Sequence, residues 1–330
     1  MTDSVPTTSR RLSRRTLMAV AGATAIEPLL PMFMCEAAPL AYELKPQVIG
    51  EGAWIVAGVP EPITLKNGGA IANITILDCK DGAIIVDTGP SRRFGEQLAR
   101  LARELTGKEI ARVYITHFHP DHAFGNQGFD AHSISAPRGV IDGLKEAGAA
   151  FSDAMYYIAQ DWMRGTEVVL PQTIAVTGIE EIGGRKLHLF EYAGHTPSDL
   201  AILDENSGLL IAGDLVFLDR APTTPHADIR KWRETLDKLR DFKASAIVPG
   251  HGPVEQGWRG IEQTRVWLSA IEEIITRSFE SGLDMTEAMK QPLPDAISNI
   301  PLARYEFERS VMHIYPKLEN ALPAVGKKVL

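Results

Sequence analysis

A short segment of this 330-residue chain carries a high density of side chains that can bind a metal ion. The strand-like run Arg112–Thr116 leads directly into His117-Phe118-His119-Pro120-Asp121-His122. Imidazole nitrogens and carboxylate oxygens are both good zinc ligands, and four of them within six residues are too many for a solvated surface. Pro120 favours a loop over a helix at this point. The chain must therefore fold so that the end of a strand delivers this loop to a metal.

Three further motifs place a metal-binding side chain beside glycine. They are Gly194-His195-Thr196-Pro197, Gly213-Asp214-Leu215 and Pro249-Gly250-His251-Gly252. Each of them stands next to an apolar run that is typical of a buried strand. Rigid scaffolds hold functional side chains on loops at strand ends, and glycine lets the backbone approach a site closely. We therefore expect His195, Asp214 and His251 to lie at the same site as the 117–122 segment.

The order of the expected elements indicates the fold class. Strand-like runs cover residues 53–58, 73–79, 83–89, 112–116, 187–192, 200–203, 209–213 and 246–249, with a hairpin turn at Asp81-Gly82. Helical spacing covers a helix from about 91 to 105 that Gly107 closes, followed by helices over 138–164 and 228–241 and a mainly helical tail from about 258. This alternation predicts an α/β domain in which helices cover two packed sheets.

Charge and cysteine content exclude several kinds of protein. The formal net charge is -8, and an acidic surface repels the phosphates of nucleic acids and acidic lipids. We therefore expect a small-molecule substrate and no nucleic-acid partner. The only cysteines are Cys35 and Cys79, so a scaffold held together by disulfides is excluded.

The first 41 residues are expected to be an export signal. A polar, basic start is followed by the apolar run Thr16–Ile26 and then by small residues up to Ala41, which is the layout of a secretory signal. Ser13-Arg14-Arg15-Thr16-Leu17-Met18 resembles the twin-arginine signal, which implies a periplasmic or secreted protein. The run is too short to cross about 30 Å of hydrocarbon, so no permanent membrane span is expected.

Other interpretations of this segment remain open. Cleavage is expected after Ala41, with Ala37 and Ala38 as alternative sites. A lipid anchor at Cys35 is disfavoured because the bulky Met34 precedes it. A buried N-terminal helix is the other competing interpretation.

The four metal motifs, in this order, resemble the metallo-β-lactamase superfamily. The resemblance covers roughly residues 48–255. It implies a four-layer αββα sandwich with the site at one edge of the two sheets, and it leaves residues 256–330 as a helical C-terminal extension. It also implies two zinc ions, with iron or manganese as alternatives. One metal would be held by His117, His119 and His195, the other by Asp121, His122 and His251, and Asp214 would bridge them.

Asp87, in the run Val86-Asp87-Thr88-Gly89, matches a further family motif. We expect it to support the site from behind, because histidine ligands usually donate their other N–H to a hydrogen-bonded partner. Asp121 and Asp214 are the expected catalytic carboxylates. They would orient a hydroxide shared by two zinc ions, which lower the pKa of water towards about 7, and would move its proton.

The resemblance also narrows the reaction. Zinc β-lactamases lack an aspartate at the bridging position, so Asp214 favours the glyoxalase II-like branch, which hydrolyses thioesters, lactones and phosphodiesters. The chain is also similar to exported zinc metallohydrolases that occur with periplasmic quinoprotein systems, which implies association with a redox system. We therefore expect hydrolysis of an ester, thioester, lactone or lactam bond. The alternatives are an iron-dependent persulfide dioxygenase, a β-lactamase proper, and a protein that uses the fold only for binding.

Substrate selection is expected from the 138–164 insert and the C-terminal helices. Five large side chains of the insert could line a groove, although core packing is the favoured interpretation: Met155, Tyr156, Tyr157, Trp162 and Met163. Arg304 and Arg309 are candidates for binding a carboxylate. The remaining histidines, His132, His188, His226 and His313, are expected to be structural. His226 is the one about which we reserve judgement, because the loop Arg220–Pro225 leads to it from Asp214.

Overall fold

Strands and helices alternate along residues 40–321, the part of the chain that the computed structural model describes. The expected signal peptide lies outside these residues except for its last two positions, and residues 322–330 of the expected extension also lie outside them. A first sheet of seven strands has the order β1-β2-β3-β4-β5-β6-β7. Its strands are β1 Pro46–Gly50, β2 Ala53–Val56, β3 Ile74–Cys79, β4 Gly82–Val86, β5 Ile110–Tyr114, β6 Ile134–Ala136 and β7 Thr173–Ile174.

A second sheet of five strands has the order β12-β11-β10-β9-β8. Its strands are β8 Gly178–Ile182, β9 Arg185–Tyr192, β10 Asp199–Asp204, β11 Leu209–Phe217 and β12 Ala246–His251. The pair β11–β12 is parallel and the other pairs are antiparallel. In the first sheet, β3 and β4 form the expected hairpin, and β4, β5 and β6 run parallel.

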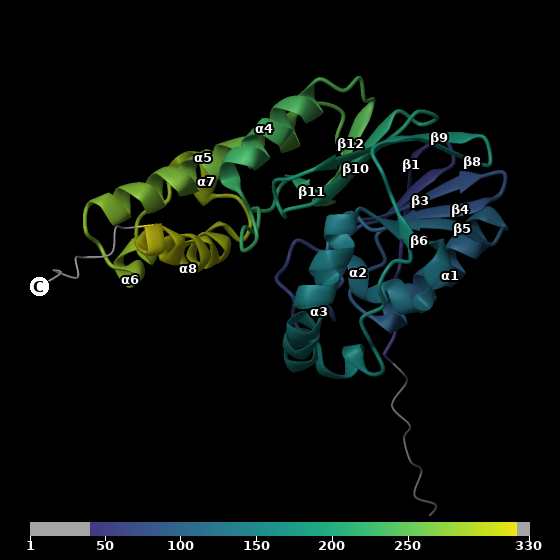
Figure 1. Ribbon diagram of the computed structural model, residues 1–330, viewed down its shortest axis with the longest axis horizontal. Coiled ribbons are helices and arrows are strands. Elements are labelled where there is room, and N and C mark those ends of the chain that lie inside the picture. Colours follow the sequence, from purple (N-terminus) through teal and green to yellow (C-terminus); the bar gives the residue numbers. More distant parts are fainter. Residues whose placement is uncertain (1–39, 322–330) are drawn as a thin grey trace, which may run out of the picture. The chain divides into compact units, whose positions relative to one another are not determined.

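Three separate apolar cores show that the molecule has four layers. One core lies between the sheets and contains side chains of both, such as Ile84 and Leu200. A second core joins the other face of the first sheet to α1 Arg92–Thr106 and α3 Arg138–Ala159. The third joins the second sheet to α4 Ile229–Arg240 and the C-terminal helices. The helices thus lie outside two stacked sheets (Figure 1), and the predicted αββα sandwich is confirmed.

β4 illustrates how the sequence specifies this stacking. All five of its residues are buried. Ala83 and Ile85 point into the helix-side core, whereas Ile84 and Val86 point into the core between the sheets. Successive side chains of a strand point to opposite faces, so a strand covered on both faces must be apolar at every position. The continuous apolar run in the sequence is therefore explained.

Helix α1 begins and ends where the sequence predicts. Ser91 is its N-cap, and its hydroxyl accepts a hydrogen bond from the backbone N–H of Phe94 at 3.3 Å. Gly107 closes the helix with a φ of 69°, a left-handed conformation that glycine adopts without a Cβ penalty. The helix buries Phe94 and Leu98 against the first sheet.

Two local predictions about the site need correction. Asp214 does not follow the end of its strand, because β11 continues to Phe217. Gly213 has a φ of 51°, and the pairing register with β12 shifts on either side of it, so the strand is irregular beside Asp214 without ending. Pro120 does not lie in a loop but is the first residue of the short helix α2 Pro120–Ala123. That position tolerates proline because its N–H would have no helical partner.

The C-terminal residues are helical, as expected. The four helices are α5 Arg259–Glu280, α6 Met285–Met289, α7 Asp295–Ser298 and α8 Ala303–Ala321. They contact one another (Figure 1), and α5 also contacts α4 and β11. Trp267 and Phe307 are fully buried in the core that they share with the second sheet. Within residues 40–321, no helix combines the length and apolar character that a membrane crossing requires.

Candidate metal centre

Seven side chains that the sequence predicts as ligands meet at one place. All of them are buried. They come from four parts of the fold: the β5–α2 junction (His117, His119, Asp121, His122), the β9–β10 loop (His195), β11 (Asp214) and the last residue of β12 (His251). Two strands of the second sheet and one of the first therefore converge on a shared edge, as the sequence analysis expected.

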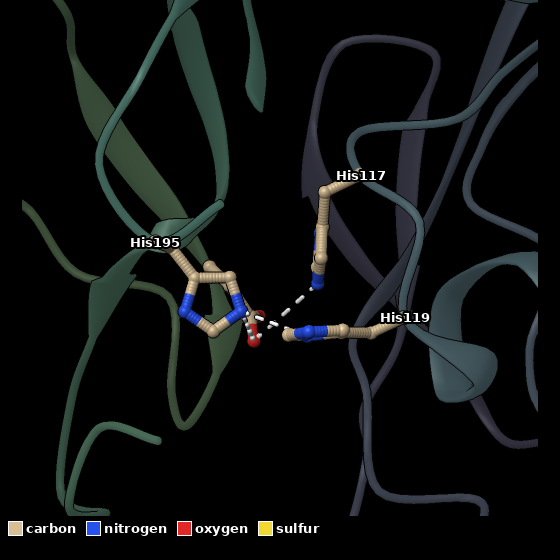
Figure 2. A group of neighbouring side chains, drawn as sticks. His117, His119 and His195 are labelled. Carbon is tan, nitrogen blue, oxygen red and sulfur yellow. Dashed lines mark hydrogen bonds and ion pairs between the residues drawn. The ribbon is translucent and has the colours of Figure 1, made fainter. Parts of the chain in front are cut away.

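The donor atoms form two groups, and within each group all of them lie within 4.8 Å of one another. The first group is His117, His119, His195 and Asp214, and the second group is Asp121, His122 and His251. Figure 2 shows His117 and His119 approaching from one side and His195 from the other, with their imidazoles pointing toward a common centre. The fold thus brings Nε2 of His195 to within 3.0 Å of Nδ1 of His119, which is 76 positions away in the chain.

The carboxylate of Asp214 faces both groups. Its Oδ2 lies 3.2 Å from Nε2 of His195 and 3.7 Å from Nε2 of His117. Its Oδ1 lies 3.2 Å from Nε2 of His122 and 3.3 Å from Nε2 of His251. One carboxylate therefore presents a separate oxygen to each group, which is the geometry of a bridging ligand.

Several buried donor atoms in this centre have no hydrogen-bond partner. They are Nε2 of His117, Nε2 of His122 and Oδ1 of Asp214. Buried polar atoms without partners are rare and costly, and one cation in each of the two groups would satisfy all three. Ligand atoms on a tetrahedral zinc with bonds of about 2.0–2.1 Å are about 3.3 Å apart, which is close to the separations of 3.2 and 3.3 Å around Asp214. The residues present therefore fit a pair of divalent metal ions.

Hydrogen bonds behind the ligands set which nitrogen faces the centre. Asp87 accepts from Nδ1 of His122 at 2.7 Å and from the Thr116 hydroxyl at 2.8 Å. Because that hydroxyl has donated its proton, its oxygen accepts from Nδ1 of His117 at 3.0 Å. Nδ1 of His251 donates to the carbonyl of Ile71 at 2.8 Å. In all three rings the Nε2 lone pair is left free to bind a cation.

The pKa values of the five histidines divide along the two groups. Burial lowers the pKa of His117, His119 and His195 well below the ordinary value. Burial also acts on His122 and His251, but nearby carboxylates, above all that of Asp214, outweigh it and raise the pKa of both rings. In the absence of metal, the imidazoles of His117, His119 and His195 therefore stay neutral down to a lower pH than those of His122 and His251.

The pKa values of the Asp121 and Asp214 carboxylates shift in the opposite direction to those of His122 and His251. Burial acts to raise the pKa of Asp121 and Asp214, but the surrounding histidines, chiefly His122 and His251, outweigh burial and lower both pKa values. Both carboxylates are therefore ionised at neutral pH, as metal ligands must be.

A cavity of about 400 Å³ opens onto the metal centre. Its floor includes His119, Asp121, Asp214 and His251. One wall is apolar and comes mainly from α3: Ile63, Phe151, Ala154, Met155 and Ile158. A polar wall comes from the loop after β11 and from α8: Arg220, Thr223, His226, Tyr305, Glu306, Arg309 and His313. The cavity is thus suited to a molecule with an apolar end and an anionic or polar end.

The polar wall contains donors that are not satisfied. Arg220 is 3% exposed, and its Nε and Nη1 make no hydrogen bond. Its Nη2 lies 3.5 Å from Oε1 of the buried Glu306, whose other oxygen is 2.9 Å from Nη1 of Arg309. Two arginines therefore share one carboxylate, which leaves one positive charge uncompensated. The Thr223 hydroxyl is also buried without a partner.

Sequence reasoning pointed to part of this wall, namely the loop Arg220–Pro225 with His226, and Arg309, but it gave Arg220 and Thr223 no role of their own. It proposed Arg304 and Arg309, and only Arg309 lines the cavity, because Arg304 donates to the carbonyls of Met289 and Gln291. Arg220 lies outside the four metal-binding motifs of the sequence. His313 was expected to be structural, yet it lines the cavity. The available signal was position: Arg220 and Thr223 follow β11 within a few residues of Asp214.

The insert supplies an apolar part of the cavity lining through residues of α3. Of its five large side chains, Met155 lines the cavity. Trp162 and Met163 are buried in the helix-side core, as favoured, whereas Tyr156 and Tyr157 are exposed to solvent. His226 lines the cavity, and its Nδ1 lies 2.9 Å from Nε2 of His119.

Comparison with known proteins shows which family this chain is similar to. A family model described as the metallo-beta-lactamase superfamily matches residues 67–251. The linear primary-alkylsulfatase of Pseudomonas sp. (strain ATCC 19151) is 24% identical over 285 residues, which are 72% of this chain and 53% of that protein. The beta-lactamase-like protein 2 homolog of Caenorhabditis elegans is 26% identical over 197 residues, 59% of each chain. The chain thus spans little more than half the length of these relatives.

Solved structures share the fold at low identity. A metallo-beta-lactamase from Pontibacter korlensis aligns with a TM-score of 0.56 and 21% identity, over 69% of this chain and 99% of that chain. A double mutant of the sec-alkyl sulfatase PisA1 aligns with a TM-score of 0.63 and 18% identity, over 86% of this chain and 52% of that chain. The second alignment includes more of this chain, so the shared fold extends beyond what the lactamase covers.

Proposed function

The chain belongs to the metallo-β-lactamase superfamily and is a metal-dependent hydrolase, and from this premise we propose that it is an exported dinuclear zinc enzyme. It would cleave an ester, thioester, lactone or lactam bond of a small molecule. The observation that carries the proposal is the carboxylate of Asp214, whose two oxygens face two separate groups of histidines. A single-metal site would not require a carboxylate in this orientation.

In this proposal His117, His119 and His195 hold one zinc ion, Asp121, His122 and His251 hold the other, and Asp214 belongs to both. When bound, the two ions supply an acidified water that serves as nucleophile at neutral pH. Asp121 lies at the floor of the cavity, with its Oδ2 3.4 Å from Nε2 of His251, where it can accept the proton of that water. Asp87 holds His122 and Thr116 in place from behind.

Metal analysis and a substrate screen test the proposal together. Purified protein should contain about two zinc ions per chain and should hydrolyse at least one of a nitrophenyl ester, a thioester, a lactone and a lactam. Chelation should abolish this activity, and zinc should restore it. Less than one metal per chain, with hydrolysis unchanged by chelation, would refute the proposal. Iron together with oxygen uptake on a glutathione persulfide would instead favour the dioxygenase.

A sulfate ester is a second candidate for the scissile bond. One relative is named a linear primary-alkylsulfatase, and the cavity joins an apolar wall to a wall with an uncompensated arginine. A linear alkyl sulfate has the same division into an apolar chain and an anionic head. Release of inorganic sulfate from an alkyl sulfate, at a rate above that of carboxylic ester hydrolysis, would establish this candidate over the first.

Export is the part of the proposal that rests on residues 1–41. We propose that Arg14 and Arg15 direct the folded chain to the periplasm, where it can associate with a redox system. Replacing both by lysine should retain active protein in the cytoplasm, because the export machinery recognises the arginine pair as a targeting signal. Fractionation of cells that express each form measures this outcome. Equal periplasmic amounts of the two forms would contradict a twin-arginine route.

A further inference from the structure

His226 lines the cavity, and its side chain hydrogen-bonds to the candidate ligand His119 from outside the two groups. Its Nδ1 lies 2.9 Å from Nε2 of His119. The other ring nitrogen of His119, Nδ1, lies 3.0 Å from Nε2 of His195. His119 thus has one nitrogen facing the first group and the other facing His226. The other two histidines of the β5–α2 junction hydrogen-bond to different partners: His117 to Thr116, and His122 to Asp87.

The fold holds the His226 ring in a defined position. Phe118 and Phe151 contact it edge to face, with ring centroids 5.2 and 5.7 Å away and interplanar angles of 69° and 90°. Aromatic pairs prefer this arrangement. The same two phenylalanines pack against His119. A small aromatic cluster therefore fixes both imidazoles relative to one another.

The backbone around His226 is also tied to the metal centre. The N–H of Asp228 donates to the carbonyl of Gly194, next to His195, at 3.0 Å. The Thr224 hydroxyl donates to Ser310 of α8 at 2.7 Å, and both side chains are buried. The turn that carries His226 is thus anchored on one side to the loop of a ligand and on the other side to the C-terminal helices.

The proton positions follow from this geometry. If Nδ1 of His119 binds a cation, its ring proton must be on Nε2, because a neutral imidazole has one proton and one lone pair. Nε2–H then points at Nδ1 of His226, which accepts it. A ligand histidine held by an acceptor in this way has a fixed tautomer and ring orientation and is a stronger base.

We propose that His226 is the positioning residue for His119, and that it thereby sets the affinity of the first group for its metal ion. The proposal rests on the dinuclear centre of the proposed function. It assigns a specific role to a histidine that the sequence places directly after the loop Arg220–Pro225 from Asp214. His226 touches a ligand and not the reacting atoms, so its effect should appear in metal binding as well as in turnover.

Two substitutions separate the hydrogen bond from the packing. His226→Phe keeps an aromatic ring against Phe118 and Phe151 but removes the acceptor. His226→Asn places a carbonyl oxygen near the position of Nδ1 and so keeps an acceptor. His313→Phe is the matched control, because His313 lines the same cavity but makes no hydrogen bond to a candidate ligand among residues 40–321.

Zinc affinity is measured by competition with a chromophoric chelator, which should show two phases in the unchanged protein, one for each metal ion. We expect His226→Phe to weaken one phase by about 10–100-fold, the usual effect of losing such a partner, and to leave the other phase unchanged. His226→Asn should stay within about three-fold of the unchanged protein. His313→Phe should alter neither phase. Cobalt substitution adds a spectroscopic test, because the visible bands of the first ion should change only in His226→Phe.

The outcomes are distinct from those of the proposed function. Two affinity phases in the unchanged protein without any hydrolysis would count against the proposed activity and leave the positioning role to be judged by the variants. Equal affinities in His226→Phe and the unchanged protein would overturn the inference. Equal weakening in His226→Phe and His226→Asn would overturn it too, since the acceptor would then be irrelevant. Urea unfolding of each variant confirms that the compared proteins are folded.

Discussion

At the scale of single residues, the site contains charged side chains that are buried from solvent. Asp214 is 2% exposed, and its oxygens face four imidazoles. Arg220 is equally buried but has no full partner, because Glu306 is shared with Arg309. Buried groups of this kind are costly unless they are paired. A metal ion would bind Asp214 and its imidazoles, and an anionic substrate would compensate the charge of Arg220.

The pKa directions predict that acid removes the two metal ions in sequence. His122 and His251 have raised pKa values, so their protonated forms compete with metal as the pH falls toward 6.5. His117, His119 and His195 have lowered pKa values and stay neutral until well below 6.5. Affinity at the second group should therefore fall first. Metal content after dialysis at stepped pH should pass through about one ion per chain, and loss of both ions in a single step would contradict this order.

Arg220→Gln should change which substrates are preferred. Three substrates with the same nitrophenolate leaving group can be compared: a neutral hexanoate ester, an adipate monoester with a free carboxylate, and a sulfate ester. The preference in kcat/KM for the anionic substrates should fall at least about ten-fold, because a hydrogen bond to a charged group contributes about 1.5–3 kcal/mol. Arg230→Gln, at an exposed arginine of α4, is the control. Equal losses on neutral and anionic substrates would show that Arg220 is only structural.

At the scale of elements, the site depends on how closely β11 and β12 approach each other. The strands are parallel and pair through Gly213. A Cβ built on Gly250 of β12 would lie 1.9 Å from Oδ1 of Asp214 and 2.7 Å from the carbonyl carbon of Gly213. The backbone can lie against the bridging carboxylate only because this residue has no side chain. A change in how β12 pairs with β11 would therefore also move the carboxylate of Asp214.

Gly250→Ala should remove the metal centre by displacing Asp214. We expect zinc content to fall below one ion per chain and kcat/KM to fall by at least about a hundred-fold, the scale expected when reacting groups move by about 1 Å. Gly282→Ala is the control: its φ of 73° imposes backbone strain, but no atom lies within 4 Å of the added Cβ. Normal zinc binding by Gly250→Ala would show that β12 can move away without cost.

At the scale of the whole molecule, the C-terminal helices are part of both the core and the cavity. They pack with Phe217 of β11 and Trp232 of α4 in the core on the second sheet's outer face, and α8 supplies one wall of the cavity. Because a sheet face must be covered to stay out of water, these helices act as the fourth layer together with α4. They are not an appendage to a complete sandwich.

A chain that stops after Trp258 should therefore fail to fold. Removing residues 259–330 exposes the large apolar face that contains Phe217, Trp232 and Leu236, and exposed patches of this kind cause aggregation. Soluble yield and the cooperativity of urea unfolding, each compared with the full chain, measure the effect. A truncated protein that unfolds in one cooperative transition would show that residues 40–258 form an independent domain.

Much of this was predictable because it is local. The strand before His117, the hairpin at Asp81-Gly82 and the caps of α1 follow from residue type and short spacing, and the structure confirms them. Local rules failed where the fold overrides them. Pro120 begins a helix, and β11 runs past Gly213, because strand pairing and burial continue across a residue whose conformation suggests an end.

By itself the sequence determined the set of candidate ligands and the kinds of element that carry them, because spacing and residue chemistry are properties of short segments. Only the tertiary structure decided that Asp214 faces two groups at once, that His226 bonds to His119 across 107 positions of chain, and that Arg220 meets Glu306 across 86. The reason is physical: a hydrogen bond or an unpaired charge depends on which atoms the packed layers bring within about 3 Å. The spacing of apolar and polar residues along the chain does not reveal the distance between atoms of residues so far apart in sequence.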